Sequence, residues 1–317
     1  MNTRSAKTQA QIEAMKEQTF GVEVEMNGIT RKDAARTAAA HFGTGTHRDT
    51  HSQNGYATWS AWDAQGREWK FQHDSSIAGP SAERCELVTP VLTYRDMELL
   101  QGLVRELRRA GAKSSQSRGC GVHIHVGSDG HTPQTVRNLV NLMASHEDQL
   151  TKAIGISAHR QHSYCRLTNE SLLDQLNAKR PTTMEGLADV WYGSQDAAWR
   201  RNDHYNDSRY HMLNLHSLFT RYHTIEFRCF NFDEPSEDRR GGLHAGQLKA
   251  MVQLCLAMSQ LAKQSRTISP KKGQRDNERY AFRCWMLRLG LIGDEFKTAR
   301  AYFMRNFEGN SAWRCAH

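Results

Sequence analysis

Three short segments of the chain each place two polar residues of catalytic type two positions apart, with apolar residues between them. Their sequences are GVEVE at residues 21–25, VHIHV at 122–126 and IEFR at 225–228. In a β-strand, residues i and i+2 point to the same face, so each segment predicts a strand with an apolar back and a charged or imidazole-bearing front. If the three strands share one sheet, their fronts form a floor of carboxylates, imidazoles and one guanidinium. Such a floor suits a divalent metal and phosphate, and its burial would otherwise be costly.

The two acidic motifs have a structural interpretation beside the functional one. Glu23 and Glu25 could occupy the solvent-exposed face of an antiparallel strand, which is common. Like charges on one face repel, however, and a cation between them would explain the pairing. Glu226 and Arg228 could form a structural ion pair. Their strand is otherwise apolar, which favours a buried site, and arginine suits a phosphoryl oxygen because it is forked and always charged.

The two histidines of the VHIHV segment would share one face of their strand. Two hydrogen-bonded structural histidines are the alternative to a functional pair. Gly119 and Gly121 lie just before the segment. They favour a function for His123 and His125, because glycine lets a ligand or another strand approach the backbone closely.

Two further acidic residues have weaker local patterns. Glu86 lies on a short apolar strand that Pro90 ends. It becomes a stronger candidate as a fourth carboxylate on the same face of the sheet. Asp74 follows a predicted hairpin and could reach a substrate amine or a metal-bound water, although turn chemistry also explains it. The chain has no Walker loop, no G-x-G-x-x-G fingerprint, no G-x-S-x-G elbow and no H-E-x-x-H motif. Metal and side chains would therefore have to handle any phosphate.

The elements that position these residues follow from the periodicity of the apolar residues. Strands are expected at 20–26, 56–63, 68–73, 83–89, 121–127, 213–218 and 224–230. Helices are expected at 30–41, 94–110, 133–154 and 241–262, in pieces through 157–210, and in a tail at about 270–317 with an exposed basic loop at 270–279. Residues 44–55 are expected to form a loop. This order predicts an α+β fold with an antiparallel or mixed sheet and helices packed on its outer face. The predicted divisions are a flexible or weakly helical lead-in at 1–18, a catalytic domain at 19–265 and a helical extension at 266–317.

Composition narrows the class of protein. The 317 residues carry a net charge of +8, which suits a protein that gathers anionic substrates such as nucleotides, or one that binds nucleic acid. Nucleic acid is less favoured, because no aromatic–basic stripe typical of single-strand binders is present. No apolar run is long enough to span a bilayer and residues 1–18 lack the apolar core of a signal peptide, so we expect a cytoplasmic protein without a membrane contact. The seven cysteines are scattered singly, which favours reduced, packed thiols.

Five motifs, in order along residues 19–262, resemble the putative amidoligase family of carboxylate–amine ligases with a glutamine-synthetase-like fold. The motifs are FGVEVE at 20–25, DSS at 74–76, ELVTP at 86–90, CGVHIHV at 120–126 and TIEFR at 224–228. Each motif is short, but five in register are fairly specific. The resemblance implies an antiparallel sheet whose concave face holds ATP and several Mg²⁺ ions.

The resemblance also implies roles for particular residues. The implied metal ligands are Glu23, Glu25, Glu86 and Glu226, and one of His123 and His125 would complete a metal site or contact the ATP phosphates. Arg228 would hold the transferring γ-phosphoryl group. Apart from the resemblance, Glu226 and Asp74 are further catalytic candidates, and Arg221 is a candidate contact to the nucleotide. The implied reaction is activation of a carboxylate by ATP, followed by attack of an amine on the acyl phosphate to form an amide.

An acyl phosphate hydrolyses, so a lid is expected to exclude water, and the polar segment Trp199–Arg209 within the insertion 157–210 is the candidate. The substrates would be a carboxylate and an amine, each a small molecule or a peptide. Two other interpretations stay open. One is a metal-dependent hydrolase or phosphotransferase that uses the same residues, and the other is a structural or nucleic-acid-binding protein with a relict site.

Overall fold

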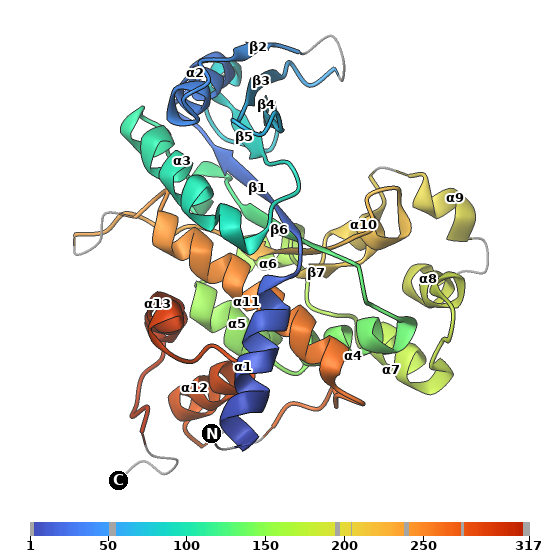
Figure 1. The fold of residues 1–317 in the computed structure, drawn as a ribbon. Coiled ribbons are helices and arrows are strands. Elements are labelled where there is room, and N and C mark those ends of the chain that lie inside the picture. The colour runs from blue at the N-terminus through green and yellow to red at the C-terminus, as the bar shows by residue number, and fades with distance from the viewer. Residues whose placement is uncertain are drawn as a thin grey trace. The chain divides into compact units, whose positions relative to one another are not determined.

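A computed structural model describes residues 3–50, 55–193, 197–203, 205–237, 241–273 and 276–312. Within these ranges the chain forms an eight-stranded sheet and 13 α-helices, which confirms the α+β class (Figure 1). The strands are β1 Phe20–Met26, β2 His47–Asp49, β3 Trp59–Trp62, β4 Glu68–Gln72, β5 Cys85–Val88, β6 Val122–Gly127, β7 Leu213–Asn214 and β8 Thr224–Phe230. Their order is β2-β3-β4-β5-β1-β6-β8-β7, so the three strands that carry the motifs are successive in one sheet.

The helices follow the strands in an irregular alternation. They are α1 Thr3–Lys16, α2 Arg31–His41, α3 Met97–Arg109, α4 Pro133–Ala144, α5 Glu147–Ile154, α6 Ala158–Ser163, α7 Glu170–Lys179, α8 Met184–Tyr192, α9 Ala197–Arg201, α10 His216–Phe219, α11 Ala245–Gln264, α12 Glu278–Arg288 and α13 Lys297–Met304. In the part of the chain that the structure describes, no helix combines the length and apolar character needed to cross a membrane.

The chain packs as two compact units. The first, called the sheet unit, comprises Thr19–Ile124 and Phe230–Lys249. The second, called the helical unit, comprises Met1–Gln18, His125–Cys229 and Ala250–His317. Strands β6 and β8 each contribute residues to both units.

In the sheet unit, alternation along the strands separates an apolar face from a polar face. β1 pairs antiparallel with β5, β5 with β4, β4 with β3 and β3 with β2. The apolar face carries the buried Val24, Leu87, Trp69 and Phe71. Helix α2 packs against β2, β3 and β4, and the ring of Phe42 at its end lies 5.0 Å from that of Trp69. The motif glutamates of β1 and β5 therefore lie on the opposite, polar face.

Helix α2 begins and ends where the sequence predicts. The side chain of Thr30 accepts a hydrogen bond from the backbone N–H of Asp33 at 3.1 Å and so caps the helix. Its buried residues are all alanines: Ala34, Ala35, Ala38 and Ala39. Their small side chains let the helix lie close against the sheet.

The helical unit contains most of α11, which is buried almost throughout from Ala250 to Ser259. A helix that is apolar on all sides belongs in a core. Gln18 binds it, because its amide nitrogen donates to the carbonyl of Leu256 at 2.9 Å and its Oε1 accepts from Ser259 and Lys263 at 2.5 and 2.9 Å. In the same unit β7 and β8 pair antiparallel, with Asn214 opposite Glu226.

Three predicted elements need correction. A single helix at 133–154 is wrong, because α4 ends at Ala144 and α5 begins at Glu147. Ser145 and the ring of His146 both bond the carbonyl of Leu142, at 3.0 and 3.1 Å, and these local bonds compete with helix continuation. A strand over 213–218 is wrong in its second half. There the side chain of Asn214 accepts the N–H of His216 at 2.7 Å and starts α10.

The third correction concerns the loop expected at 44–55. It contains β2, which pairs with β3 through residues 47–49, while residues 51–54 lie outside the described ranges. The segment predicted as a lead-in contains α1, whose Ile12 and Met15 are buried. Helix α11 begins at Ala245 and not at 241.

The cysteines among the described residues are free thiols, as their scattered positions predict. They are Cys85, Cys120, Cys165, Cys229, Cys255 and Cys284, and all but the last are buried. Burial raises the pKa of Cys120 to about 12, with the nearby Glu25 carboxylate acting in the same direction. The five buried thiols are therefore packing residues.

Candidate functional site

The polar face of the sheet unit brings three of the predicted residues together. Antiparallel pairing sets Glu25 of β1 directly opposite Glu86 of β5. One possible ligand atom from each of Glu25, Glu86 and His123 lies within 4.8 Å of the other two. The backbone N–H of Gly121, just before β6, donates to Oε2 of Glu25 at 2.5 Å, which fixes this carboxylate in place. We call Glu23, Glu25, Glu86 and His123 the carboxylate cluster.

His123 is held between two of these carboxylates. Its Nδ1 lies 2.9 Å from Oε2 of Glu23, and its Nε2 lies 3.8 Å from Oε1 of Glu25. A neutral ring that donates from Nδ1 to Glu23 presents the lone pair of Nε2 toward Glu25. Metal-binding histidines show this arrangement, in which a carboxylate accepts from one ring nitrogen and orients the other toward the ion.

The charges of the cluster fit a divalent cation. Like charges directly opposite each other on neighbouring strands are destabilising. Glu25 is only 6% exposed, and among the described residues it forms no ion pair with a lysine or an arginine. A donor set of carboxylate oxygens with one imidazole suits Mg²⁺ or Mn²⁺. The residues present therefore fit the metal that the sequence predicts.

The helical unit holds a second set of predicted residues, on β8. Glu226 and Arg228 are 4% and 6% exposed, and Nη1 of Arg228 donates to Oε1 of Glu226 at 2.5 Å. Asn214 donates to the other oxygen of Glu226 at 2.6 Å. The guanidinium of Arg228 also lies over the ring of Tyr210, 5.8 Å from its centre. A buried ion pair needs such additional partners, because desolvation of both charges is costly.

The partner that sequence reasoning missed is Asn214. It begins a short chain of polar contacts, since its Oδ1 accepts the N–H of His216, whose Nδ1 lies 2.6 Å from the hydroxyl of Tyr192. Burial raises the pKa of Tyr192 to about 12, although Arg201 opposes this, so the hydroxyl stays protonated. The predicted pairing of these two strands indicated that a residue of 213–218 lies across from Glu226, and the observed register makes that residue Asn214.

Three other predicted residues lie in different surroundings. Nδ1 of His125, in the helical unit, contacts the hydroxyl of Thr224 at 3.2 Å. Arg221 is exposed on the turn before β8, where it donates to the hydroxyl of Tyr222 at 3.1 Å. Asp74 accepts the N–H of Ser76 at 2.7 Å, which is ordinary turn chemistry. Roles for these three in catalysis or nucleotide binding stay predictions.

The segment predicted as a lid is described at 199–203 and 205–209, and residue 204 lies outside the described ranges. Trp199 and Tyr205 are exposed there. Arg200 fixes its start, by donating to the carbonyl of Tyr192 at 2.8 Å. A closing motion of this segment stays a prediction.

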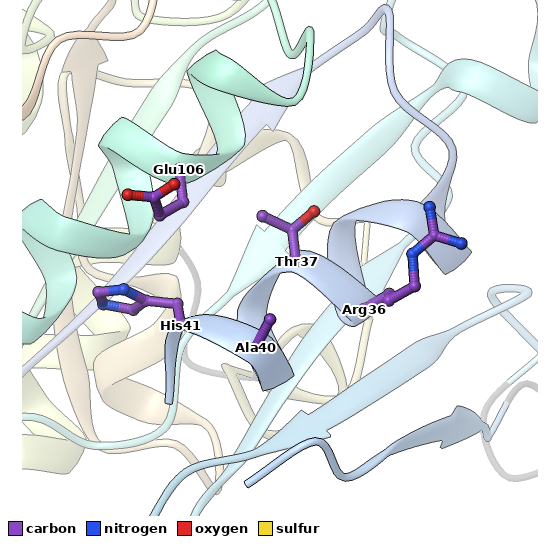
Figure 2. A pocket seen from close by; sticks show the side chains of 5 residues that line it. All are labelled: Arg36, Thr37, Ala40, His41 and Glu106. Atoms are coloured by element: carbon purple, nitrogen blue, oxygen red, sulfur yellow. The ribbon is translucent and has the colours of Figure 1, made fainter. Parts of the chain in front are cut away.

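A hollow of about 550 Å³ lies beside α2 in the sheet unit. Figure 2 shows Glu106 on α3 and four residues of α2 around it: Arg36, Thr37, Ala40 and His41. The ring of His41 contacts the carbonyl of Leu99 at 3.0 Å, and Arg36 pairs with Asp33 at 2.7 Å. None of the lining residues belongs to the carboxylate cluster, and their contacts are structural.

The sheet unit thus places a carboxylate–imidazole cluster, whose geometry fits a cation, on the polar face of an antiparallel sheet. A family model described as "putative amidoligase enzyme" matches residues 16–259. The chain belongs to this family, which confirms the resemblance seen in the motifs.

Comparisons with curated proteins and with solved structures give no further assignment. No curated protein matches the sequence. A bifunctional glutathione synthetase from Pasteurella multocida is similar in structure, with a TM-score of 0.44 and 11% sequence identity over 95% of this chain. The chain spans about half the length of that protein, 48%.

Proposed function

We propose that the protein is an ATP- and Mg²⁺-dependent ligase that joins a carboxylate to an amine. The observation that carries the proposal is the carboxylate cluster, in which Glu23 orients His123 and thereby directs Nε2 toward Glu25, and in which Glu86 lies opposite Glu25. Family membership supports amide formation as the reaction, and the hard, oxygen-rich donor set supports Mg²⁺ as the ion.

The reaction has two steps. An oxygen of the substrate carboxylate attacks the γ-phosphorus, the bond from that phosphorus to the bridging oxygen breaks, and ADP leaves. The amine nitrogen then attacks the acyl carbon, the carbon–oxygen bond to phosphate breaks, and the amine loses a proton as the amide forms. When bound, Mg²⁺ would neutralise the phosphate charges.

Particular residues are assigned to these tasks. Glu25, Glu86 and His123 hold the cation. Glu23 orients His123 and was also expected as a ligand from the sequence. Arg228 is assigned to the transferring phosphoryl group, because its guanidinium is forked, always charged and rich in N–H donors. Glu226 orients Arg228 and keeps its predicted role as a metal ligand.

The test is Mg²⁺-dependent release of ADP from ATP, measured across a matrix of amino acids, other carboxylates, amines and short peptides. Glu86→Gln is the inactive variant. Glu98→Gln is the matched control, because Glu98 is an exposed acid at the start of α3 in the same unit. Release that needs both an acid and an amine, and that disappears only in Glu86→Gln, supports the ligase.

Other outcomes separate the alternatives. Release that never depends on an amine would indicate a hydrolase or phosphotransferase. A folded protein that binds neither Mg²⁺ nor ATP would refute the proposal and favour a structural or nucleic-acid-binding role, which salt-sensitive binding to RNA or DNA would then test.

A further inference from the structure

The polar face that carries the carboxylate cluster continues onto the next strand of the sheet unit, β4. The strand register places Gln72 directly opposite Glu86. It also places Lys70 directly opposite Val88, which in turn faces Glu23. Directly opposed residues of antiparallel strands project from the same face, with Cβ atoms about 4.5–5.5 Å apart. Gln72 and Lys70 therefore lie beside the cluster and project from the same surface.

Lys70 is not committed to a close partner. Its Nζ lies 3.7 Å from Oε2 of Glu68, which is longer than a hydrogen bond, and the two side chains are 41% and 30% exposed. Glu68 itself is fixed, because Ser60 donates to its Oε1 at 2.7 Å and Thr50 supports Ser60 at 2.7 Å. No other acid among the described residues pairs with Lys70. Its ammonium is free to turn toward a ligand.

The side-chain carboxamide of Gln72 also carries N–H donors. Its side chain is half-buried, yet the carboxamide makes no hydrogen bond to any residue in the described ranges. An ammonium and a carboxamide, side by side next to a cation site, present donors to an anion with several oxygens that also binds the metal.

The structure assigns Lys70 and Gln72 to the phosphate chain of the nucleoside triphosphate whose oxygens the cluster's cation would bind, an inference that rests on the proposed function. A phosphate chain matches both features of this face, since it bridges a divalent cation and a lysine. Lys70, on β4, would supply positive charge to the phosphate chain. Gln72 would fix the orientation of the phosphate chain between Lys70 and Glu86.

The experiment compares Lys70→Met with wild type by titration calorimetry, using β,γ-imido-ATP with Mg²⁺ and, separately, inorganic tripolyphosphate with Mg²⁺. Mn²⁺ alone, followed by electron paramagnetic resonance, reports the cation site. The matched control is Lys32→Met, which removes a lysine of α2 that lies over the ring of Trp59. A second variant, Lys70→Arg, keeps the charge.

We expect Lys70→Met to weaken binding of both phosphate probes about ten- to a hundredfold, because it removes a charge-assisted hydrogen bond. Mn²⁺ binding should not change, and Lys32→Met and Lys70→Arg should bind the probes nearly as wild type does. Gln72→Leu should show a smaller loss on the same probes.

Two results would overturn the inference in different ways. If Lys70→Met binds both probes as tightly as wild type, Lys70 does not contact the phosphate chain, and the proposed function is untouched. If folded wild-type protein binds Mn²⁺ but neither phosphate probe, the proposed function itself fails and the inference fails with it.

Discussion

The sheet unit contains two acidic clusters that differ in what balances their charge. In the β3–β4 hairpin, Asp63 accepts four hydrogen bonds, from the backbone of Gln65 and Arg67, from Nε of Arg67 and from the indole of Trp69. Arg67 also reaches Asp96 at 2.9 Å. In the carboxylate cluster on β1, β5 and β6, Glu25 accepts the backbone N–H of Gly121 and Glu23 contacts Nδ1 of His123.

The difference supports a structural role for the hairpin network and the proposed ligand-binding role for the carboxylate cluster. Burial alone would raise the pKa of Asp63, but hydrogen bonds from Trp69 and Arg67 outweigh it and lower the pKa. The hairpin thus stabilises its own charges within the fold. The carboxylate cluster keeps two acids face to face on neighbouring strands, an arrangement that repels unless a cation lies between them. On the proposed function, the hairpin acids stabilise the fold and the carboxylate cluster would bind a cation.

The largest expected effect comes from removal of a cluster ligand. Glu86→Gln should weaken Mn²⁺ binding at least about a hundredfold, because it removes a charged ligand while it keeps the shape of the side chain. The melting temperature without metal should stay the same or rise, because repulsion with Glu25 is relieved. Mn²⁺ should raise the melting temperature of wild type and not of the variant, as measured by scanning calorimetry.

Glu98→Gln is the control for this prediction and should respond to Mn²⁺ as wild type does. Equal Mn²⁺ affinity in Glu86→Gln and wild type would mean that the cluster is not the cation site, and the comparison between the two clusters would lose its basis.

The hairpin should behave in the opposite way. Asp63→Ala should lower the free energy of unfolding by about 2–4 kcal/mol, because the buried indole of Trp69 and one N–H of Arg67 lose their acceptor. This figure allows for the partial exposure of Arg67, since solvent screens its ion pair. Urea unfolding measures the cost. The folded variant should bind Mn²⁺ as tightly as wild type, and a loss of Mn²⁺ affinity at unchanged stability would contradict the distinction.

Glu23 should fall between these two cases. Glu23→Gln removes the charge that orients His123 without removing the residue that faces Glu25, so Mn²⁺ affinity should drop about ten- to a hundredfold. If Glu23 is itself a ligand of the same ion, the loss should match that of Glu86→Gln. A titration of both variants under one set of conditions decides between the two roles.

Much of this site is predictable from the sequence, for a physical reason. The period of two in a strand puts Glu23 with Glu25 on one face whatever the sheet around them, and an apolar run ended by Pro90 marks β5 and thus Glu86. The register between strands is not local. The register pairs Glu25 with Glu86 and places Lys70 and Gln72 beside them, and the sequence pattern within one strand does not predict it.

Side-chain competition with the backbone explains the errors in the fold. The apolar residues over 133–154 have helical spacing. This spacing does not predict the hydrogen bonds that Ser145 and His146 make to the carbonyl of Leu142. Likewise Asn214 looks like one residue of a longer strand until its side chain accepts the N–H of His216 and turns the chain. A pattern of apolar residues does not reveal hydrogen bonds between short polar side chains and their own backbone.

The smallest predicted effect tests the hairpin network through pH. Burial alone would raise the pKa of Asp96, but hydrogen bonds from Arg67 and Thr93 lower it. A carboxyl whose pKa is lower in the folded state contributes stability above its unfolded pKa of about 4, and this contribution disappears as the pH falls through the folded pKa. Asp96→Asn should therefore be less stable than wild type by about 1 kcal/mol at neutral pH, and the difference should shrink as the pH falls below about 4. Urea unfolding of both proteins across this range measures the gap, and a gap that stays constant with pH would show that the ionised form of Asp96 is not what stabilises the hairpin.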